Sequence, residues 1–289
     1  MKIGFVTCVE LGLSCLEKIS AMGGRLDAIV TLHDDIARQK SGRVYLDSFC
    51  DENQTQLHKI RHINDADSIE LLKALSLDWL FIIGWSQIAS KQVLETTRLG
   101  VLGMHPTLLP EGRGRAAIPW AIIRDLSKTG VTLFKLDEGV DTGPIVDQYV
   151  IPLTTRIDAK ELYEKVNEAH VSLIEKVWQP LVDGRIELKV QDESQATIWA
   201  GRTPVDGRLV PDMSIAEADR LIRATTRPYP GAWISFGDKQ FIIWKADIKT
   251  DRISSEELST AWVLSFTGGE LLCLDYEEIP IANWYPIEK

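Results

Sequence analysis

The pattern of apolar and polar positions predicts an N-terminal region of alternating strands and helices. Met1–Val6 is a mostly apolar strand, and Leu11–Met22 repeats apolar residues every three to four positions, as an amphipathic helix does. Asp27–Leu32 is a second strand. Asp67–Leu75 has helical periodicity, and Trp79–Ile83 is a continuous apolar run typical of a strand buried on both faces. The alternation favours a parallel sheet with helical crossovers.

The same pattern continues through the middle of the chain. Val101–Met104 and Val131–Leu136 are predicted strands on either side of a helix over Ile118–Arg124. Residues 34–55, rich in Asp, Arg, Lys and Ser, predict an irregular surface connection. A doubly wound domain of this kind binds its ligand outside the carboxyl ends of the strands.

A change from alternating strands and helices to several short strands predicts a second, mainly β domain. Ala159–Trp178 is a long predicted helix, with Asp158 as its N-cap and Pro180 as its stop. After Gly184 come the helix Ser214–Thr225 and the short strands Trp233–Phe236, Phe241–Trp244, Trp262–Phe266 and Leu271–Leu274. We place the boundary near residue 200, which gives domains 1–199 and 200–289.

Composition and charge restrict the partners. Of the 289 residues, 45% are hydrophobic, yet no apolar run approaches the roughly 20 residues that cross a bilayer. The first residues lead straight into a strand and not into a signal peptide. A net charge of −10 argues against nucleic acid, which needs a basic face. Four cysteines without metal-ligand or redox spacing complete the expectation of a cytoplasmic protein with small-molecule substrates.

Two polar residues follow predicted strands at the ligand-binding edge. His105 comes just after Val101–Met104, in front of a loop with Pro and Gly. Asp141 lies in Val-Asp-Thr-Gly after Val131–Leu136. The topology brings both to the same edge of the sheet. A His–carboxylate pair there is suited to removing a proton from an attacking amine, and a structural role for each residue is the alternative.

These motifs resemble the folate-dependent formyltransferase superfamily. The first is His105-Pro-Thr-Leu-Leu-Pro-x-x-x-Gly114, with Asp141-Thr-Gly downstream. Gly84-Trp-Ser-Gln-Ile88 stands where that family has its folate-contacting loop. Arg202-Thr-Pro-Val-Asp-Gly207 and Arg223-Ala-Thr-Thr-Arg-Pro-Tyr-Pro-Gly-Ala232 are similar to its C-terminal domain. Because several motifs occur in the same order, the resemblance covers most of the chain.

The resemblance implies an α/β fold: a Rossmann-like N-terminal domain followed by a smaller β domain like an OB-fold barrel. It implies 10-formyltetrahydrofolate as the formyl donor and His105 and Asp141 as catalytic residues. It also implies folate contacts from two segments, namely Trp85, Ser86, Gln87 and Ile88, and the loop residues Thr107, Leu109, Pro110 and Gly114. No metal is expected, since the histidines form no metal-site pattern.

One position departs from the family's Asn-x-His plus Asp set, because Gly103 stands where the family has Asn. The missing amide would donate a hydrogen bond to the formyl oxygen as it becomes an oxyanion. Losing such a donor costs roughly 3–4 kcal/mol. A backbone N–H group, a bound water, Ser86 or Gln87 would replace it; the alternative is a protein that has drifted from formyl transfer. Since the rest of the motif is intact, we expect replacement.

The expected acceptor is a 4-amino sugar on a nucleotide carrier, because the C-terminal motifs resemble enzymes of that kind. The acidic chain argues against methionyl-tRNA, and the added C-terminal domain argues against glycinamide ribonucleotide. Arg113 and Arg115, in the Gly-rich loop beside His105, are candidate ligands of the diphosphate. Solvated loop charges are the alternative.

Three other functions stay open at this point. One is a methionyl-tRNA formyltransferase-like enzyme acting on another amine. The second is a formyltetrahydrofolate deformylase, which would release formate without an acceptor. The third is a folate-binding protein that has lost turnover because of Gly103. A homodimer is compatible with the sequence.

Overall fold

The first sheet is built around strands whose side chains are buried on both faces. In the computed structural model, all four residues of β1 (Ile3–Val6) and of β4 (Trp79–Ile82) are buried. β1 lies between β4 and β2 (Ala28–Leu32) and runs parallel to both. The continuous apolar runs therefore mark the centre of the sheet.

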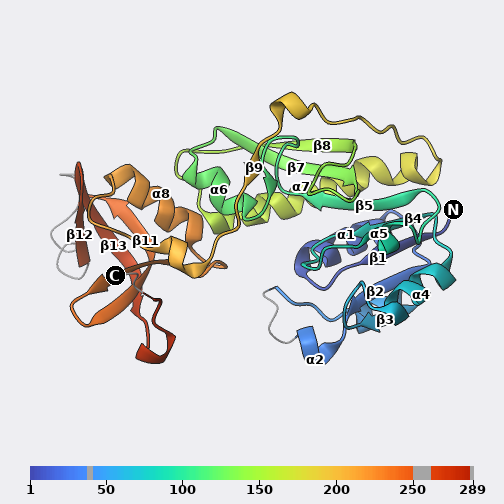
Figure 1. Ribbon diagram of the computed structural model, residues 1–289, viewed down its shortest axis with the longest axis horizontal. Helices are drawn as coiled ribbons and strands as arrows, with labels where there is room; N and C mark the ends of the chain where they lie inside the picture. Colours follow the sequence, from blue (N-terminus) through green and yellow to red (C-terminus); the bar gives the residue numbers. More distant parts are fainter. Residues whose placement is uncertain (38–41, 250–261, 287–289) are drawn as a thin grey trace. The chain divides into compact units, whose positions relative to one another are not determined.

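Seven strands form this sheet among the residues described, in the order β3-β2-β1-β4-β5-β7-β8 (Figure 1). β3 (Leu57–Ile60) is parallel to β2, and β5 (Gly100–His105) is parallel to β4. β7 (Lys128–Lys135) is antiparallel to β5, and β8 (Ile145–Pro152) lies next to β7. The parallel prediction thus holds for the first five strands, and the α/β fold class is confirmed.

Helices cover both faces of the sheet because successive strand residues point to opposite sides. On one face Phe5 stacks on Phe81, and Phe81 stacks on Trp178, with ring centroids 5.6 and 6.5 Å apart. On the other face Val6 packs in a cluster with Leu72. The helices of this region are α1 (Glu10–Ala21), α2 (Asp34–Ala37), α3 (Asp47–Glu52), α4 (Ala66–Leu75), α5 (Lys91–Leu94) and α7 (Ala159–Val182).

Helix α7 begins as predicted but ends later. Asp158 Oδ1 accepts a hydrogen bond from the Glu161 N–H at 2.9 Å, which makes Asp158 the N-terminal cap. The prediction that Pro180 stops the helix is wrong, since α7 continues to Val182. Pro180 lies in the last turn, where its missing N–H costs a single hydrogen bond. The chain then leaves the helix at Gly184, which has a φ of +69°.

The connection over residues 34–55 is more regular than predicted. Residues 38–41 lie outside the described residues, but the remainder contains α2 and α3, and Cys50 of α3 is buried. Helices of one or two turns are too short to show an apolar repeat. β3 and β8 were missed for a different reason: most of their side chains are only partly buried, so their apolar signal is weak.

The structure describes residues 1–37, 42–249 and 262–286, and its contacts divide the chain into two units. The first unit contains the seven-stranded sheet. The second contains the chain from Trp199 onward together with two earlier segments, Gly114–Thr129 and Pro152–Lys165. None of the described helices is long and apolar enough to cross a membrane.

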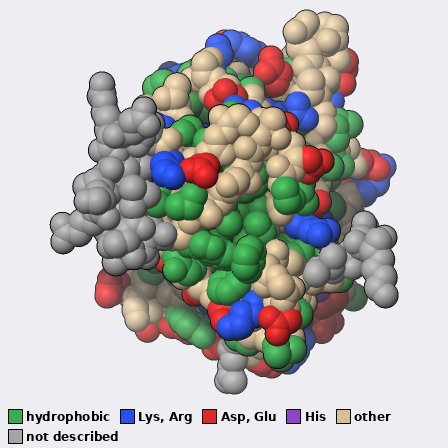
Figure 2. Space-filling view, turned by 90° about the vertical axis from the view of Figure 1, so that its left-hand side faces the viewer, with side chains coloured by type: hydrophobic (Ala, Val, Ile, Leu, Met, Phe, Trp, Pro, Cys, Tyr) green, Lys and Arg blue, Asp and Glu red, His purple; other side chains and the backbone are tan. Residues whose placement is uncertain are grey.

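An antiparallel sheet with one packed helix forms the core of the second unit. The sheet order is β10-β11-β13-β12. Ala218 and Ile222 of the helix α8 pack against Ile243 and Leu264 of the sheet. Figure 2 shows a face of the molecule on which hydrophobic side chains gather. The elements of this unit are α6 (Ala117–Ile123), α8 (Ile215–Thr225), β10 (Ala232–Phe236), β11 (Lys239–Ile248), β12 (Trp262–Phe266) and β13 (Gly269–Glu278).

The second unit confirms the predicted helix before the strands and shows how it begins. Ser214 is the N-cap of α8: its hydroxyl accepts from the Glu217 N–H at 3.2 Å, and its own N–H donates to Glu217 Oε2 at 2.9 Å. This reciprocal pair is a capping box, which satisfies two backbone or side-chain donors at the helix start. A smaller two-stranded sheet pairs β6 (Arg113–Gly114) with β9 (Ile198–Trp199).

One buried histidine of α7 makes stability depend on pH. His170 is 3% exposed, and its Nδ1–H donates to Val166 O at 2.7 Å. Burial is the main reason that the pKa of His170 is lowered from 6.5 to about 4, and the neighbouring His105 lowers it further. The native state therefore binds fewer protons than the unfolded chain between those two values. Stability contributed by the neutral ring is complete above pH 6.5 and is lost as pH falls toward 4.

We predict that His170→Leu removes this dependence. In the wild type the free energy of unfolding should rise with pH by about 1.4 kcal/mol per pH unit across the window, which is the value for one proton. Denaturant titrations across that window should show a slope reduced by this amount in His170→Leu. The exposed His62 offers the control, since His62→Gln should keep the wild-type slope. An unchanged slope in His170→Leu would contradict the assignment.

Candidate active site

His105 is the last residue of β5, and the loop that follows it holds the imidazole ring. Only 10% of the His105 side chain is exposed. Its Nε2 lies 2.8 Å from Gly112 O. A carbonyl oxygen only accepts, so we assign the hydrogen to Nε2, which donates it. In the neutral ring the lone pair is then on Nδ1.

Asp141 approaches that Nδ1 atom from the loop between β7 and β8. The distance from Asp141 Oδ2 to His105 Nδ1 is 3.5 Å, and 19% of the Asp141 side chain is exposed. The two residues that the sequence placed at one edge of the sheet thus lie together. Asp141 has a φ of +55°, a left-handed conformation that non-glycine residues rarely adopt.

The two side chains face each other at Nδ1. With a neutral imidazole, the His105 Nδ1 lone pair and the Asp141 carboxylate are two acceptors. An N–H group that donates between them relieves the repulsion. The pair is therefore chemically able to accept a proton from an amine and to stabilise the imidazolium that results.

Hydrogen bonds from β7 and β8 fix the loop after His105. Thr132 Oγ1 donates to Thr107 O at 2.7 Å and accepts from the Leu109 N–H at 3.0 Å. Gln148 Nε2 donates to Leu109 O at 2.8 Å. Thr107 and Leu109 are 1% and 2% exposed, so both side chains belong to the interior of the loop. Thr132 and Gln148 lie more than 20 residues along the chain, and no sequence signal marked them.

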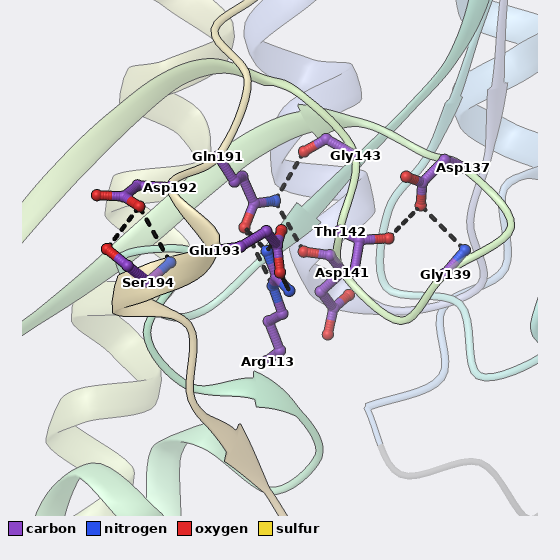
Figure 3. Close-up of polar contacts among 10 residues, drawn as sticks. All are labelled: Arg113, Asp137, Gly139, Asp141, Thr142, Gly143, Gln191, Asp192, Glu193 and Ser194. Atoms are coloured by element: carbon purple, nitrogen blue, oxygen red, sulfur yellow. Dashed lines mark hydrogen bonds and ion pairs between the residues drawn. The ribbon is translucent and has the colours of Figure 1, made fainter.

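The loop of residues 136–144 is closed by its own contacts. At its base the Lys135 N–H donates to Pro144 O at 2.9 Å. Asp137 Oδ1 accepts from Thr142 Oγ1 at 2.7 Å (Figure 3). Gly143 passes so close to Lys135 O that a Cβ at this position would overlap it. The glycine after Asp141-Thr is therefore required by the close approach of two backbone segments.

A second set of hydrogen bonds ties this loop to a segment far along the chain (Figure 3). Gln191 Nε2 donates to Asp141 O at 2.8 Å and to Gly143 O at 2.7 Å. Gln191 Oε1 accepts from Arg113 Nε and Nη2 at 3.1 and 2.8 Å. The same guanidinium donates to both carboxylate oxygens of Glu193, at 2.9 and 2.6 Å. Gln191 and Glu193 are functional candidates that sequence reasoning missed.

This arrangement corrects the expectation for Arg113. Its side chain is 5% exposed, and all three of its nitrogen atoms bind Gln191 or Glu193. It is neither a solvated loop charge nor open to a diphosphate. The hydrogen bond to Glu193 is the main cause of a raised Arg113 pKa, with attraction from Asp137 and Asp141 adding to it. Arg115 is exposed, and its role in substrate binding stays a prediction.

The predicted folate loop, Trp85–Ile88, follows β4 at the carboxyl edge. The Gln87 amide is bound within the protein: its Oε1 accepts from the Ile63 N–H at 2.8 Å, and its Nε2 donates to Arg61 O at 3.1 Å. Gln87 therefore cannot replace the missing Asn without leaving both partners. Ser86 is exposed, and Ile88 is 83% exposed, so the end of this loop offers apolar surface to solvent.

Two buried polar atoms in the predicted folate segments are suited to a ligand. Trp85 Nε1 and Thr107 Oγ1 have no hydrogen-bond partner among the residues that the structure describes. Leaving a buried donor unpaired costs about 1–3 kcal/mol, so such atoms are usually satisfied by a ligand or by water. Pro110 and Gly114, the other predicted folate contacts of this loop, are in contact with the protein itself. Pro110 O accepts from the Thr197 N–H, and a Cβ on Gly114 would overlap Trp199 O.

Gly103 lies two residues before His105 on the same face of β5. A Cβ built at Gly103 lies 2.7 Å from Leu136 Cδ2. The Leu136 side chain thus occupies the space that a longer residue at position 103 would need. A side chain at position 103 would therefore require the end of the Leu136 side chain to shift.

No group of three or more His, Cys, Asp or Glu side chains in the described part of the chain could hold a metal ion. All four cysteines are buried.

Fold and site together define an α/β enzyme class with a His–Asp pair at the carboxyl edge of its sheet. Sequence comparison identifies the class. Residues 18–177 match the model of the formyl transferase family, and residues 203–283 match that of the formyl transferase C-terminal domain. The chain belongs to the formyl transferase family.

Solved structures share the fold at low sequence identity. The N-formyltransferase from Helicobacter canadensis, in complex with folinic acid and dTDP-3-aminofucose, is 19% identical with a TM-score of 0.72, covering 94% of this chain and 98% of its own. The sugar 3N-formyltransferase WlaRD, in the presence of dTDP and 5-N-formyl-THF, is 18% identical with a TM-score of 0.69. The match covers 94% of this chain and 96% of that one. Methionyl-tRNA formyltransferase from Clostridium thermocellum is 20% identical with a TM-score of 0.62, and the match covers 96% of this chain and 99% of that one.

Proposed function

We propose that this protein transfers the formyl group of 10-formyltetrahydrofolate to the amine of a nucleotide-linked amino sugar. The observation that carries the proposal is the His105–Asp141 contact of 3.5 Å in a chain of the formyl transferase family. Both residues stand in the motifs that resemble the family's catalytic positions. Trp85 Nε1 and Thr107 Oγ1, two buried donors without a partner among the described residues, lie in the segments proposed to contact folate.

In this proposal His105 is the general base. Its Nδ1 accepts the proton of the attacking amine, while Nε2 stays bonded to Gly112 O and keeps the ring in place. Asp141 stabilises the imidazolium at 3.5 Å, which lowers the free energy of the charged state. The protonated ring can then return the proton to the folate nitrogen that leaves.

The folate donor supplies the formyl carbon, and this chain must stabilise the negative charge that develops on the formyl oxygen. Leu136 fills the space beside Gly103, and Gln87 is bonded to the backbone of residues 61 and 63. We therefore infer that a backbone N–H group, a bound water or the exposed Ser86 supplies the hydrogen bond. Such a donor needs no side chain at position 103.

The proposed acceptor is supported by similarity alone. One of the similar structures is a sugar 3N-formyltransferase in the presence of dTDP, and another, an N-formyltransferase, is in complex with dTDP-3-aminofucose. The C-terminal motifs of this chain favour a 4-amino sugar. The net charge of −10 disfavours methionyl-tRNA. The test is a donor-turnover assay with nucleotide-linked 3-amino and 4-amino sugars, with methionyl-tRNA as a comparison and an acceptor-free reaction to detect formate release.

We predict that His105→Ala and Asp141→Asn each lower kcat by about 100-fold or more, the usual contribution of a general base and of its charge partner. The reason is that Ala cannot accept the proton and a neutral amide cannot stabilise an imidazolium. Steady-state kinetics with the best acceptor of the panel measure the loss. Asp183→Asn is a matched control, because among the described contacts the Asp183 carboxylate binds Gln179 and Arg185, both near the end of α7.

Wild-type turnover in either site variant would remove that residue from the proposed chemistry. Formate release at the same rate with and without an acceptor would identify a deformylase. Folate binding with no turnover of any amine or of water would identify a binding protein. Transfer to methionyl-tRNA in preference to the sugars would replace the proposed acceptor.

We further predict that Gly103→Asn does not raise turnover. An added side chain meets Leu136, and overpacking of this kind typically costs 1–3 kcal/mol, so kcat should fall or stay level. If the site had decayed through loss of the Asn donor, the same substitution would raise kcat by roughly 100-fold. Steady-state kinetics of the two proteins distinguish the outcomes, and a slow wild type rescued by Asn would overturn the proposed function.

A further inference from the structure

The side chain of Gln191 links Arg113 and Glu193 to the Asp141 loop by hydrogen bonds. Gln191 is 5% exposed, and its amide is used at both ends: one oxygen accepts from a cation, and one nitrogen donates to two loop carbonyls. The amide orientation is therefore fixed, because the guanidinium can only donate and the carbonyls can only accept.

We propose that Gln191, Arg113 and Glu193 are positioning residues that hold Asp141 in the conformation that faces His105. This inference rests on the proposed function of the His105–Asp141 pair. Asp141 has a φ of +55°, a backbone conformation that costs free energy and persists only where its surroundings enforce it. Gln191 Nε2 binds the carbonyl of Asp141 itself and that of Gly143, one on each side of Thr142.

Arg113 fixes Gln191 in turn. Its guanidinium is planar and presents Nε and Nη2 to the same Gln191 oxygen, which defines the rotamer of the amide. Glu193 binds the other edge of the guanidinium with both carboxylate oxygens. Glu193 is 69% exposed and Arg113 is 5% exposed, so the exposed carboxylate neutralises a buried cation. The order of action runs from Glu193 to Arg113, to Gln191 and to the loop.

The decisive variant is Gln191→Glu, which has the same shape. A carboxylate still accepts from Arg113, but it cannot donate to the two loop carbonyls and repels them. We expect kcat to fall by roughly ten- to hundredfold, the scale of a small misplacement of a reacting group. The KM for the folate donor should change little, because the predicted folate segments make no contact with Gln191 among the described hydrogen bonds.

The matched control is Asp192→Ala, in the same segment. Asp192 Oδ1 accepts from the Ser194 N–H and hydroxyl, at 3.0 and 2.7 Å, and neither bond reaches the loop (Figure 3). This variant should keep wild-type kcat. Glu193→Ala changes an exposed residue and so tests the same network if Gln191→Glu does not fold. Its kcat should fall by several-fold, since Arg113 loses one of its two partners.

A double-mutant cycle separates positioning from general stability. In the Asp141→Asn background, Gln191→Glu should add little further loss, because its effect passes through the carboxylate that is already absent. Hydrogen exchange of the peptide covering residues 137–143 gives a readout independent of turnover. Exchange should be faster in Gln191→Glu than in the wild type and unchanged in Asp192→Ala.

The outcomes distinguish failure of the proposed catalytic pair from failure of the positioning role alone. If Asp141→Asn turns over as the wild type does, the proposed catalytic pair is wrong. If Asp141→Asn is impaired while Gln191→Glu keeps wild-type kcat and loop exchange, the positioning role alone is wrong. Additive losses in the double variant would likewise assign Gln191 to stability and not to Asp141.

Discussion

The candidate site depends on contacts made by one segment that follows α7. After α7 the polar segment 191–197 runs back past both loops at the carboxyl edge of the sheet. Through Gln191 it binds the Asp141 loop, and through Thr197 it binds the loop that follows His105: Thr197 Oγ1 accepts from the Gly112 N–H at 2.8 Å. Gly112 is also the residue whose carbonyl fixes the His105 ring. A single segment therefore binds both of the loops that hold the pair, whose side chains lie 3.5 Å apart.

The sequence could predict the strands and the placement of His105 and Asp141 because both depend on short-range signals. Continuous apolar runs such as Trp79–Ile83 mark buried strands, and the topology then brings residues at strand ends to one edge. His105 and Asp141 follow from that rule. Gln191 could not be predicted in this way, since it lies 50 residues from Asp141 in a polar stretch without periodicity. A polar side chain acting through such a contact leaves no local pattern.

Wrong expectations had equally physical causes. Arg113 looked like an exposed loop cation because Gly112 and Gly114 flank it, and glycines usually mark an open loop. The partners that bury it come from far along the chain. Pro180 looked like a helix stop, yet in the last turn of α7 it interrupts too little to end the helix, which Gly184 does instead. In both cases the local rule was sound, but its effect depended on where the residue lies in the folded structure.

The buried cation shows why such a network is better understood through position than through stability. Removing Arg113 from water is unfavourable, and the hydrogen bond and attraction from Glu193 offset that cost, as the raised pKa of Arg113 indicates. An apolar residue of similar size would often serve the core as well. It could not present two donors to the Gln191 oxygen, and the Gln191 amide would then be free to rotate away from the loop. The proposed role of Arg113 is therefore to fix the orientation of Gln191 and, through it, the left-handed backbone of Asp141.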